Sequence, residues 1–247
     1  MQLRWLVPAL ALGAALCGCG HPPAPAAATG PTRFGEASEA RQIGADREPD
    51  QWFTPGRDVG GTYYSPLDAI SDKTVERLGF AWNYALGTRR GLEATPVVVD
   101  GVLYTAGNWG RVYALDAATG RELWTYDPGV DGQWGRYACC DVVNRGVAVR
   151  DGRVYVASLD GYLHAIDART GQRLWRADTL PGRGPKDFHY FITGAPVLAG
   201  DLIVIGSGGS DFKGARGSVS ADSATPSCRR ARGRLTARSV SISAIGT

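Results

Sequence analysis

Two adjacent cysteines, Cys139 and Cys140, are the residues of this 247-residue chain whose type and spacing most directly suggest chemistry. A trans peptide holds neighbouring Cα atoms about 3.8 Å apart, whereas disulfides usually span roughly 4.4–6.8 Å, so a bond between them would close a stiff, strained ring. Strain of this kind is concentrated at functional sites. The alternative is a pair of reduced thiols in the core, because free cysteine is often buried.

The first twenty residues, MQLRWLVPALALGAALCGCG, predict export of the chain. A charged residue precedes an apolar run that is shorter than the ~20 residues a helix needs to cross a bilayer, which favours a signal peptide over residues 1–18. The segment around Cys19 resembles a bacterial lipobox, with Cys19 as the lipidated residue. Cleavage nearby with plain secretion is the alternative, and both routes lead to compartments where disulfides persist.

Cysteine pairing follows from this interpretation. If Cys17 is removed and Cys19 is acylated, the chain retains Cys139, Cys140 and Cys228. Three thiols leave one unpaired, so the pairing arithmetic favours a disulfide between the two neighbours.

The elements that must position this pair come as a repeat of about 50 residues. Each unit opens with two apolar strands around a short turn, at 96–107, 146–158 and 196–207, and Asp-Gly between alternating hydrophobics is a strong hairpin signal. The second halves at 110–124 and 161–175 both read Ala-x-Asp-Ala-x-Thr-Gly-x-x-x-Trp. Four strands per unit at this period predict a β-propeller.

The repeated motif has a physical role at each end. Asp and Thr side chains bond the backbone of a tight turn, and the terminal Trp offers a large flat surface to the neighbouring blade. The third unit begins the same way at 217–221 and keeps Asp222-x-x-Thr225, but Pro226 stands where Gly is expected. Upstream, residues 74–84 alternate and predict a strand with Phe80, Trp82 and Tyr84 on one face.

The two ends of the chain differ from the repeats. Residues 19–48 begin Pro/Ala-rich and predict an extended tether, with a short polar helix around 36–48. Residues 222–247 form an aberrant Arg/Ser-rich tail of net charge +4, so the preceding chain carries −1 and no basic face for nucleic acid. One hypothesis is a change of reading frame near 221–226; the alternative is a natural disordered tail.

A family resemblance brings these features together. The run ACCDVVNRG, preceded by Glu93 in GLEATPVVVDG and followed by FITGAPVLAGDLIVIGSGGSDFKGARG, closely resembles the pyrroloquinoline-quinone (PQQ) dependent alcohol dehydrogenases over roughly residues 49–221. The resemblance implies an all-β fold: about three four-stranded blades of an eight-bladed quinoprotein propeller with tryptophan-docking motifs. Residues 74–84 would then be the outer strand that completes the ring.

The same resemblance implies a cofactor site. PQQ is a planar quinone with three carboxylates, so its site needs a flat surface, donors at the rim and a hard cation. By resemblance, a Cys139–Cys140 disulfide forms the plate over the ring and Arg145 binds a carboxylate with its planar fork. Asp211 falls where the family ligates calcium, although Asp is shorter than the Glu expected there. The other residues implied to bind the cofactor are Glu93, Val143, Thr193, Gly209 and Ser210.

Each of these residues also has a local interpretation. Arg145 would pair with Asp141, Thr193 would cap a strand turn, and Asp211 would bind its own loop backbone, as most polar side chains are satisfied nearby. His164 alternates with Tyr162 and is expected to be a packed side chain. No Cys-x-x-Cys-His occurs in these residues, so no c-type haem is expected within them.

The implied activity is that of a periplasmic, lipid-anchored, calcium-dependent enzyme that oxidises an alcohol by hydride transfer to PQQ. Electrons would leave to a cytochrome c or a membrane quinone. The family's catalytic Asp lies downstream of the third blade, so this chain is expected to be an N-terminal fragment that is inactive alone. The rival is a non-catalytic propeller lipoprotein that acts as an outer-membrane assembly scaffold, which shares the repeats but needs no cofactor plate or carboxylate clamp.

Overall fold

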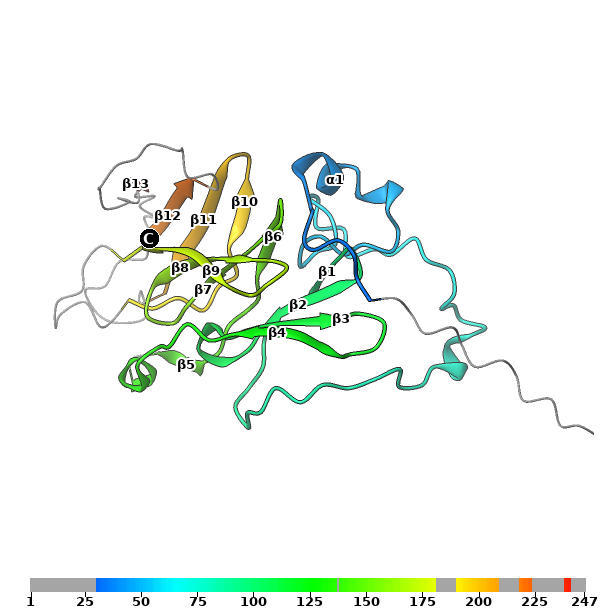
Figure 1. Cartoon of the computed structure of the whole chain (residues 1–247), viewed down its shortest axis with the longest axis horizontal. Coiled ribbons are helices and arrows are strands. Elements are labelled where there is room, and N and C mark those ends of the chain that lie inside the picture. The colour runs from blue at the N-terminus through cyan, green and yellow to red at the C-terminus, as the bar shows by residue number, and fades with distance from the viewer. Residues whose placement is uncertain (1–29, 137, 181–189, 209–217, 224–237, 241–247) are drawn as a thin grey trace, which may run out of the picture.

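The computed structural model describes residues 30–136, 138–180, 190–208, 218–223 and 238–240, without the side chains of Cys139 or of the last two segments. In these ranges the chain forms three four-stranded antiparallel sheets, which follow one another in chain order (Figure 1). The predicted all-β partial propeller with three blades is therefore confirmed.

The first blade contains β1 (Val97–Val99), β2 (Val102–Ala106), β3 (Val112–Asp116) and β4 (Glu122–Tyr126). The second contains β6 (Ala148–Arg150), β7 (Arg153–Ala157), β8 (Tyr162–Asp167) and β9 (Arg173–Asp178). The third contains β10 (Val197–Ala199), β11 (Leu202–Ser207), β12 (Ser218–Ser223) and β13 (Arg238–Val240). Outside the blades lie α1 (Glu39–Ile43), β5 (Cys139–Val142) and four short 3-10 helices at Ala45–Arg47, Val75–Arg77, Asn108–Gly110 and Gly132–Arg136.

The first two hairpins turn at the predicted Asp-Gly pairs. Asp100 and Gly101 have φ of 56° and 77°, and Asp151 and Gly152 have φ of 48° and 71°. Two successive left-handed residues match the twist of the flanking strands, which is why Asp-Gly is favoured there.

The hydrophobic core lies between the blades. Strands of the first and second sheets bury one cluster, which includes Val97, Tyr104, Trp124, Val149 and Ile166. A second cluster, with Tyr155, Leu163, Ile203 and Ile205, joins the second sheet to the third. Each four-stranded sheet thus buries a face against its neighbour, as blades of a propeller do.

Tryptophan docking joins the first blade to the second. Trp124, at the end of the first blade's motif, donates from Nε1 to the carbonyl of Ala168 at 2.9 Å. Its ring lies against Gly171, where an added Cβ would come within 2.8 Å of Trp124 Cδ2. Gly171 also has φ of 73°. Both this backbone conformation and the contact with the Trp124 ring therefore disfavour any residue with a side chain at this position. The Asp167 side chain shapes this turn by accepting from the backbone of Thr170 at 2.8 Å.

The segment predicted as the ring-closing strand docks in the same way but forms no strand. Trp82 donates to Ala117 O at 3.0 Å and lies against Gly120, as Trp124 does in the next blade. Trp82 and Tyr84 are half-buried on one face, as predicted, but Phe80 is 97% exposed. A strand needs a neighbour for its backbone groups, and the described residues provide none along 78–86.

The predicted tether ends earlier than residue 48. The predicted short helix is present as α1, with Ser38 accepting from Arg41 N at its first turn, and Ala37 and Ala45 are buried in the core between the first two blades. Gln42 is 2% exposed and donates to Val149 O at 3.0 Å. From about residue 34 the chain is therefore part of the propeller rather than a linker. None of the helices in the described ranges is long and apolar enough to cross a membrane.

Candidate functional site

Three of the predicted site residues meet at one place. Arg145 pairs with Glu93 at 2.9 Å between NH2 and Oε2, and its NH1 donates to Thr193 Oγ1. The Arg145 and Glu93 side chains are 44% and 42% exposed, so both remain open to a ligand. Arg145 does not pair with Asp141, and Thr193 contacts Arg145 through its hydroxyl. We call Glu93, Arg145 and Thr193 the clamp.

The backbone around Arg145 positions the clamp across all three blades. Glu93, Arg145 and Thr193 each lie just before the first strand of a blade, β1, β6 or β10. Arg145 N donates to Thr193 O at 2.8 Å, and Thr95 N donates to Arg145 O at 3.3 Å. Because these bonds join three sheets through one residue, the clamp geometry is fixed by the packing of the blades.

The buried side chain of Asn144 fixes the turn at Arg145 through hydrogen bonds to the backbone. It is 2% exposed, and its Nδ2 donates to Ala157 O at 2.7 Å while its Oδ1 accepts from Gly146 N at 3.0 Å. Gly146 has φ of 135°, and a Cβ there would lie 3.1 Å from Thr95 O. A buried amide with both ends bonded fixes the direction in which the Arg145 side chain leaves the backbone.

The cysteine pair lies on β5, which ends three residues before Arg145 in the chain. Cys140 is exposed and disulfide-bonded. The side chain of Cys139 lies outside what the structure describes, so the predicted pairing of the two neighbours stays a prediction. The next residue, Asp141, has φ of 60° and pairs with Arg90, whose guanidinium also lies 5.9 Å from the centre of the Trp109 ring. Trp109 also has a left-handed backbone conformation, with φ of 67°. Non-glycine residues with positive φ cluster at functional sites.

The loop that carries Glu93 is held by Asn108. Asn108 is 8% exposed and donates from Nδ2 to Gly91 O at 2.9 Å. Val143, predicted to bind the cofactor, is 3% exposed and packs behind the same loop. A side chain at Gly91 would meet Val143 Cγ1 at 3.9 Å. Val143 therefore supports the loop from the interior.

Other predicted site residues fall outside the described ranges. Gly209, Ser210, Asp211 and the lipidation candidate Cys19 are among them. Among the described residues, no three His, Cys, Asp or Glu side chains gather as they would around a metal ion.

His164 is a packed side chain, as predicted. It is 1% exposed, its Nδ1 bonds Tyr126 OH at 2.9 Å, and its Nε2 bonds Ser158 Oγ at 3.0 Å. Burial, aided by Arg173 and Arg176, lowers the pKa of His164 to about 4, so the ring is neutral at physiological pH.

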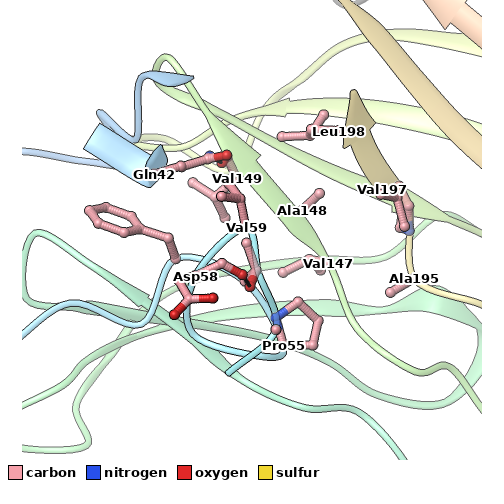
Figure 2. A pocket seen from close by; sticks show the side chains of 14 residues that line it. Gln42, Pro55, Asp58, Val59, Val147, Ala148, Val149, Ala195, Val197 and Leu198 are labelled. Atoms are coloured by element: carbon pink, nitrogen blue, oxygen red, sulfur yellow. Dashed lines mark hydrogen bonds between the residues drawn. The ribbon is translucent and has the colours of Figure 1, made fainter. Parts of the chain in front are cut away.

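A cavity of about 250 Å³ lies elsewhere, between the N-terminal segment and the inner strands (Figure 2). Its walls are mostly apolar: Pro55 and Val59 on one side face β6 and β10 on the other, with Asp58 and Gln42 as polar members. None of the clamp residues lines it. The clamp is therefore separate from this cavity, and two of its three side chains, Arg145 and Glu93, are partly exposed.

Comparison with known proteins identifies the family. The family model described as "Glucose/ethanol/alcohol dehydrogenase, beta-propeller domain" matches residues 52–224, more than half of the chain. This chain belongs to the PQQ-dependent alcohol dehydrogenases. Quinohemoprotein alcohol dehydrogenase ADH-IIG of Pseudomonas putida is 54% identical over 182 residues, which are 74% of this chain and 25% of that protein. The 1-butanol dehydrogenase (cytochrome c) of Thauera butanivorans is 51% identical over 72% of this chain and 25% of its own length.

Solved structures agree with the fold of this PQQ-dependent alcohol dehydrogenase segment. ADHIIG from Pseudomonas putida HK5 superposes with a TM-score of 0.73 at 52% identity, over 77% of this chain and 27% of that chain. The quinohemoprotein alcohol dehydrogenase of Comamonas testosteroni gives a TM-score of 0.70 at 45% identity, over 76% and 27%. The chain thus spans about a quarter of the length of the curated relatives it matches.

Sequence reasoning found the clamp and missed its supports. Arg90, Asn108 and Asn144 carry no motif by themselves, because each acts through a carbonyl or carboxylate that is distant in sequence. The Asn-Arg-Gly order at 144–146 was the available signal: a short amide before a glycine is typical of a side chain that bonds its own turn.

Proposed function

We propose that this chain is the N-terminal part of an exported, PQQ- and calcium-dependent alcohol dehydrogenase, and that the clamp holds one edge of the cofactor. The observation that carries the proposal is the meeting of Glu93, Arg145 and Thr193 at the starts of three blades. The disulfide-bonded Cys140 precedes Arg145 by five residues in the chain. A scaffold has no need of such a clamp, so the family assignment and the clamp together favour the enzyme over the assembly-scaffold alternative.

The residues present suit a flat, polycarboxylate ligand. The Arg145 guanidinium is partly exposed and presents forked N–H donors, which match carboxylate geometry. In the free chain Glu93 and Thr193 satisfy those donors, so binding exchanges one set of partners for another with no buried charge left unpaired. The exposed sulfur of Cys140, within a proposed Cys139–Cys140 disulfide, offers an apolar surface to a ring face.

The chemistry itself is supplied by the cofactor. When bound, PQQ would supply the hydride acceptor for oxidation of the alcohol. This chain's own contribution is to bind and orient: Arg145 and Thr193 donate at the rim, and Asn144 fixes Arg145. The calcium part of the proposal rests on Asp211 and on the family, because oxygen ligands suit that ion.

Electron transfer and location complete the proposal. Relatives are named quinohemoprotein and cytochrome c-linked alcohol dehydrogenases, and others are named alcohol dehydrogenase (quinone), which supports a cytochrome c or a membrane quinone as acceptor. Export and lipid anchoring at Cys19 rest on the N-terminal sequence. The alcohol is a small-molecule substrate of undefined chain length.

A chimera tests this function. Residues 52–221 of this chain replace the matching segment of Pseudomonas putida ADH-IIG, and alcohol-dependent dye reduction is measured with and without added PQQ and calcium. We expect activity that requires both additions and that falls at least about tenfold in the Arg145→Ala chimera, because one charged hydrogen-bonded contact is lost. A folded chimera that binds PQQ no better than Arg145→Ala does would contradict the proposal.

The matched control for this substitution is Arg111→Ala. Arg111 pairs with Asp127 on the same blade, and these side chains are 46% and 50% exposed, close to the values for Arg145 and Glu93. Its loss removes the same charge and a similar ion pair, and the partner of the Arg111 side chain is Asp127 rather than a clamp residue, so activity is expected to stay near that of the parent chimera.

A further inference from the structure

The cavity between the N-terminal segment and the inner strands of the second and third blades has the size of a small-ligand site (Figure 2). Its volume of about 250 Å³ exceeds the roughly 150 Å³ of an engineered apolar cavity that takes up benzene. Apolar residues from three segments of the chain form most of its walls, among them Pro55, Val59, Val147, Ala148, Val197 and Leu198. A molecule that fills such a cavity gains dispersion contacts with these walls.

Gln42, one of three polar residues that line the cavity, has its hydrogen-bond partners within the chain. Its Nε2 donates to Ala37 O at 3.2 Å and to Val149 O at 3.0 Å. Its Oε1 accepts from NH2 of Arg150 at 3.2 Å. Both N–H donors of this amide are therefore used, and its carbonyl already accepts from a cation.

Thr54 and Asp58, the other two polar residues of the lining, are engaged in the same way. Thr54 Oγ1 donates to the carbonyl of Asp58 at 2.8 Å. The Asp58 carboxylate accepts from Thr62 N at 3.2 Å and from the Thr62 hydroxyl, which lowers the pKa of Asp58. The carboxylate is thus charged at neutral pH and disfavours an anion, while Arg57 NH1, 3.9 Å from its Oδ2, offsets its attraction for a cation. The side chains of the cavity therefore select an uncharged, apolar ligand.

The cavity opens to solvent through two of its apolar residues. Val59, from the N-terminal segment, and Val197, from β10, both line it and are each 61% exposed. Ala148, on β6, is only 9% exposed and belongs to the deeper part of the wall. A small molecule can therefore enter while the blades stay folded.

The walls of the cavity continue the two segments that carry Arg145 and Thr193. Val147 follows Arg145 by two residues, and Ala195 stands in the same position after Thr193. Between them, a Cβ on Gly146 would lie 3.7 Å from the Cβ of Ala195. Arg145 N donates to Thr193 O at 2.8 Å across this junction of the second and third blades. A ligand in the cavity would contact both sides of the junction that sets the clamp.

We propose that this cavity binds a small, uncharged, apolar molecule, of the size of one aromatic ring or a short alkyl chain. The occupant braces the junction of the second and third blades next to the clamp. Burial of hydrocarbon against hydrocarbon drives the binding, because the polar side chains of the lining are already engaged. The site requires neither quinone nor metal, so it is additional to the proposed cofactor site.

Titration of benzene into the full chain tests this inference, with the methyl NMR signals of the lining residues and thermal unfolding as readouts. Val197→Phe places a ring at the open side of the cavity, and Ala148→Leu fills it from β6. Leu202→Phe is the matched control for the first substitution. It adds the same ring on the neighbouring strand, at a position that is 47% exposed and does not line the cavity.

We expect saturable shifts at the methyl groups of Val59, Val147 and Leu198 in the parent chain and in Leu202→Phe. Binding should be at least about fivefold weaker in Val197→Phe and Ala148→Leu, because the added carbons occupy the volume of the ligand. At ten times its dissociation constant, benzene should raise the melting temperature of the parent chain by about 3–6 °C, since it binds the folded chain.

Hydrogen exchange tests the brace. Benzene should slow exchange of the Arg145 amide, which bonds Thr193 O, at least about threefold. The Gly120 amide, which bonds Asp116 O at 2.8 Å within the first blade, should keep its rate.

The proposal is overturned if the lining methyl groups show no saturable shift, or if the two cavity variants bind benzene as tightly as Leu202→Phe does. Equal slowing of exchange at Arg145 and Gly120 would overturn the brace. These readouts involve no cofactor, so they stand or fall independently of PQQ binding at the clamp.

Discussion

Gly171→Ala tests how strongly the docking of Trp124 holds the first two blades together. The φ of 73° costs an L-residue about 1–2 kcal/mol. The added Cβ would also lie 2.8 Å from Cδ2 and Cε3 of Trp124, a ring that is 8% exposed and bonded to Ala168, so it cannot move aside freely. Overpacking of this kind costs about 1–3 kcal/mol. We expect a total loss of about 2–5 kcal/mol in the free energy of unfolding.

Gly129→Ala is the matched control, because Gly129 has φ of 72° and no atom within 4 Å of an added Cβ. Urea unfolding of both variants separates the backbone cost from the contact with the ring, which should account for about 1–3 kcal/mol of the difference. The same substitution in a Trp124→Leu background should fall to the cost of Gly129→Ala. If Gly171→Ala costs no more than Gly129→Ala, docking does not join the blades.

Three further predictions concern the core histidine, the cysteine pair and its neighbour. Burial lowers the pKa of His164 to about 4 from an unfolded value near 6.5, so the stabilisation by the neutral ring is complete above pH 6.5 and is lost as pH falls toward 4. In urea titrations, the free energy of unfolding of His164→Gln should therefore fall by about 2–3 kcal/mol less than that of the parent between pH 7 and 4.5. Trypsin should release residues 137–145 without reduction as one peptide lighter by two hydrogens, since it contains both Cys139 and Cys140; a mixed disulfide to another peptide would contradict the vicinal bond. Arg90→Met should weaken PQQ binding several-fold while changing the free energy of unfolding by less than about 1 kcal/mol, because its ion pair with Asp141 is half-exposed; unchanged binding would show that the Asp141 turn does not depend on it.

Local sequence patterns predicted the blades and their turns because the residues that interact there are close together in the chain. The Asp-Gly hairpins and the Asp-x-x-Thr-Gly turns are each closed within six residues, so residue type alone specifies them. The packing of the segment before residue 48 was not predictable, for the opposite reason. Gln42 is fixed by Val149, more than a hundred residues away, and no local signal contains that bond.

Strand formation at 74–84 shows a second limit. The alternation of Trp82 and Tyr84 correctly predicted which face packs, since burial follows side-chain direction. It could not predict a partner strand, because alternation specifies the direction of side chains and carries no signal for the strand that would lie alongside. The same limit applies to the Asp222-x-x-Thr225 pattern. Asp116 lies opposite Val102, the first residue of β2, whereas Asp222 lies opposite Ile203, the second residue of β11, so the third pattern is shifted by one residue.

The clamp was predictable through resemblance, and its supports were not. Glu93, Arg145 and Thr193 come together as implied, whereas Asn108 and Asn144 act through buried bonds to distant carbonyls. Physical reasoning on isolated residues had offered local partners for Arg145 and Thr193. The structure shows instead that Arg145 takes partners from two other blades.

The most direct test of the central claim is a titration of PQQ into the full chain, followed by tryptophan fluorescence. We predict saturable binding that is at least about tenfold weaker in Arg145→Ala and unchanged in Arg111→Ala, because a charged hydrogen-bonded contact is worth about 1.5–3 kcal/mol. Equal affinity of the Arg145→Ala variant and the parent chain, or an equal loss in Arg111→Ala, would contradict the assignment of the clamp to the cofactor.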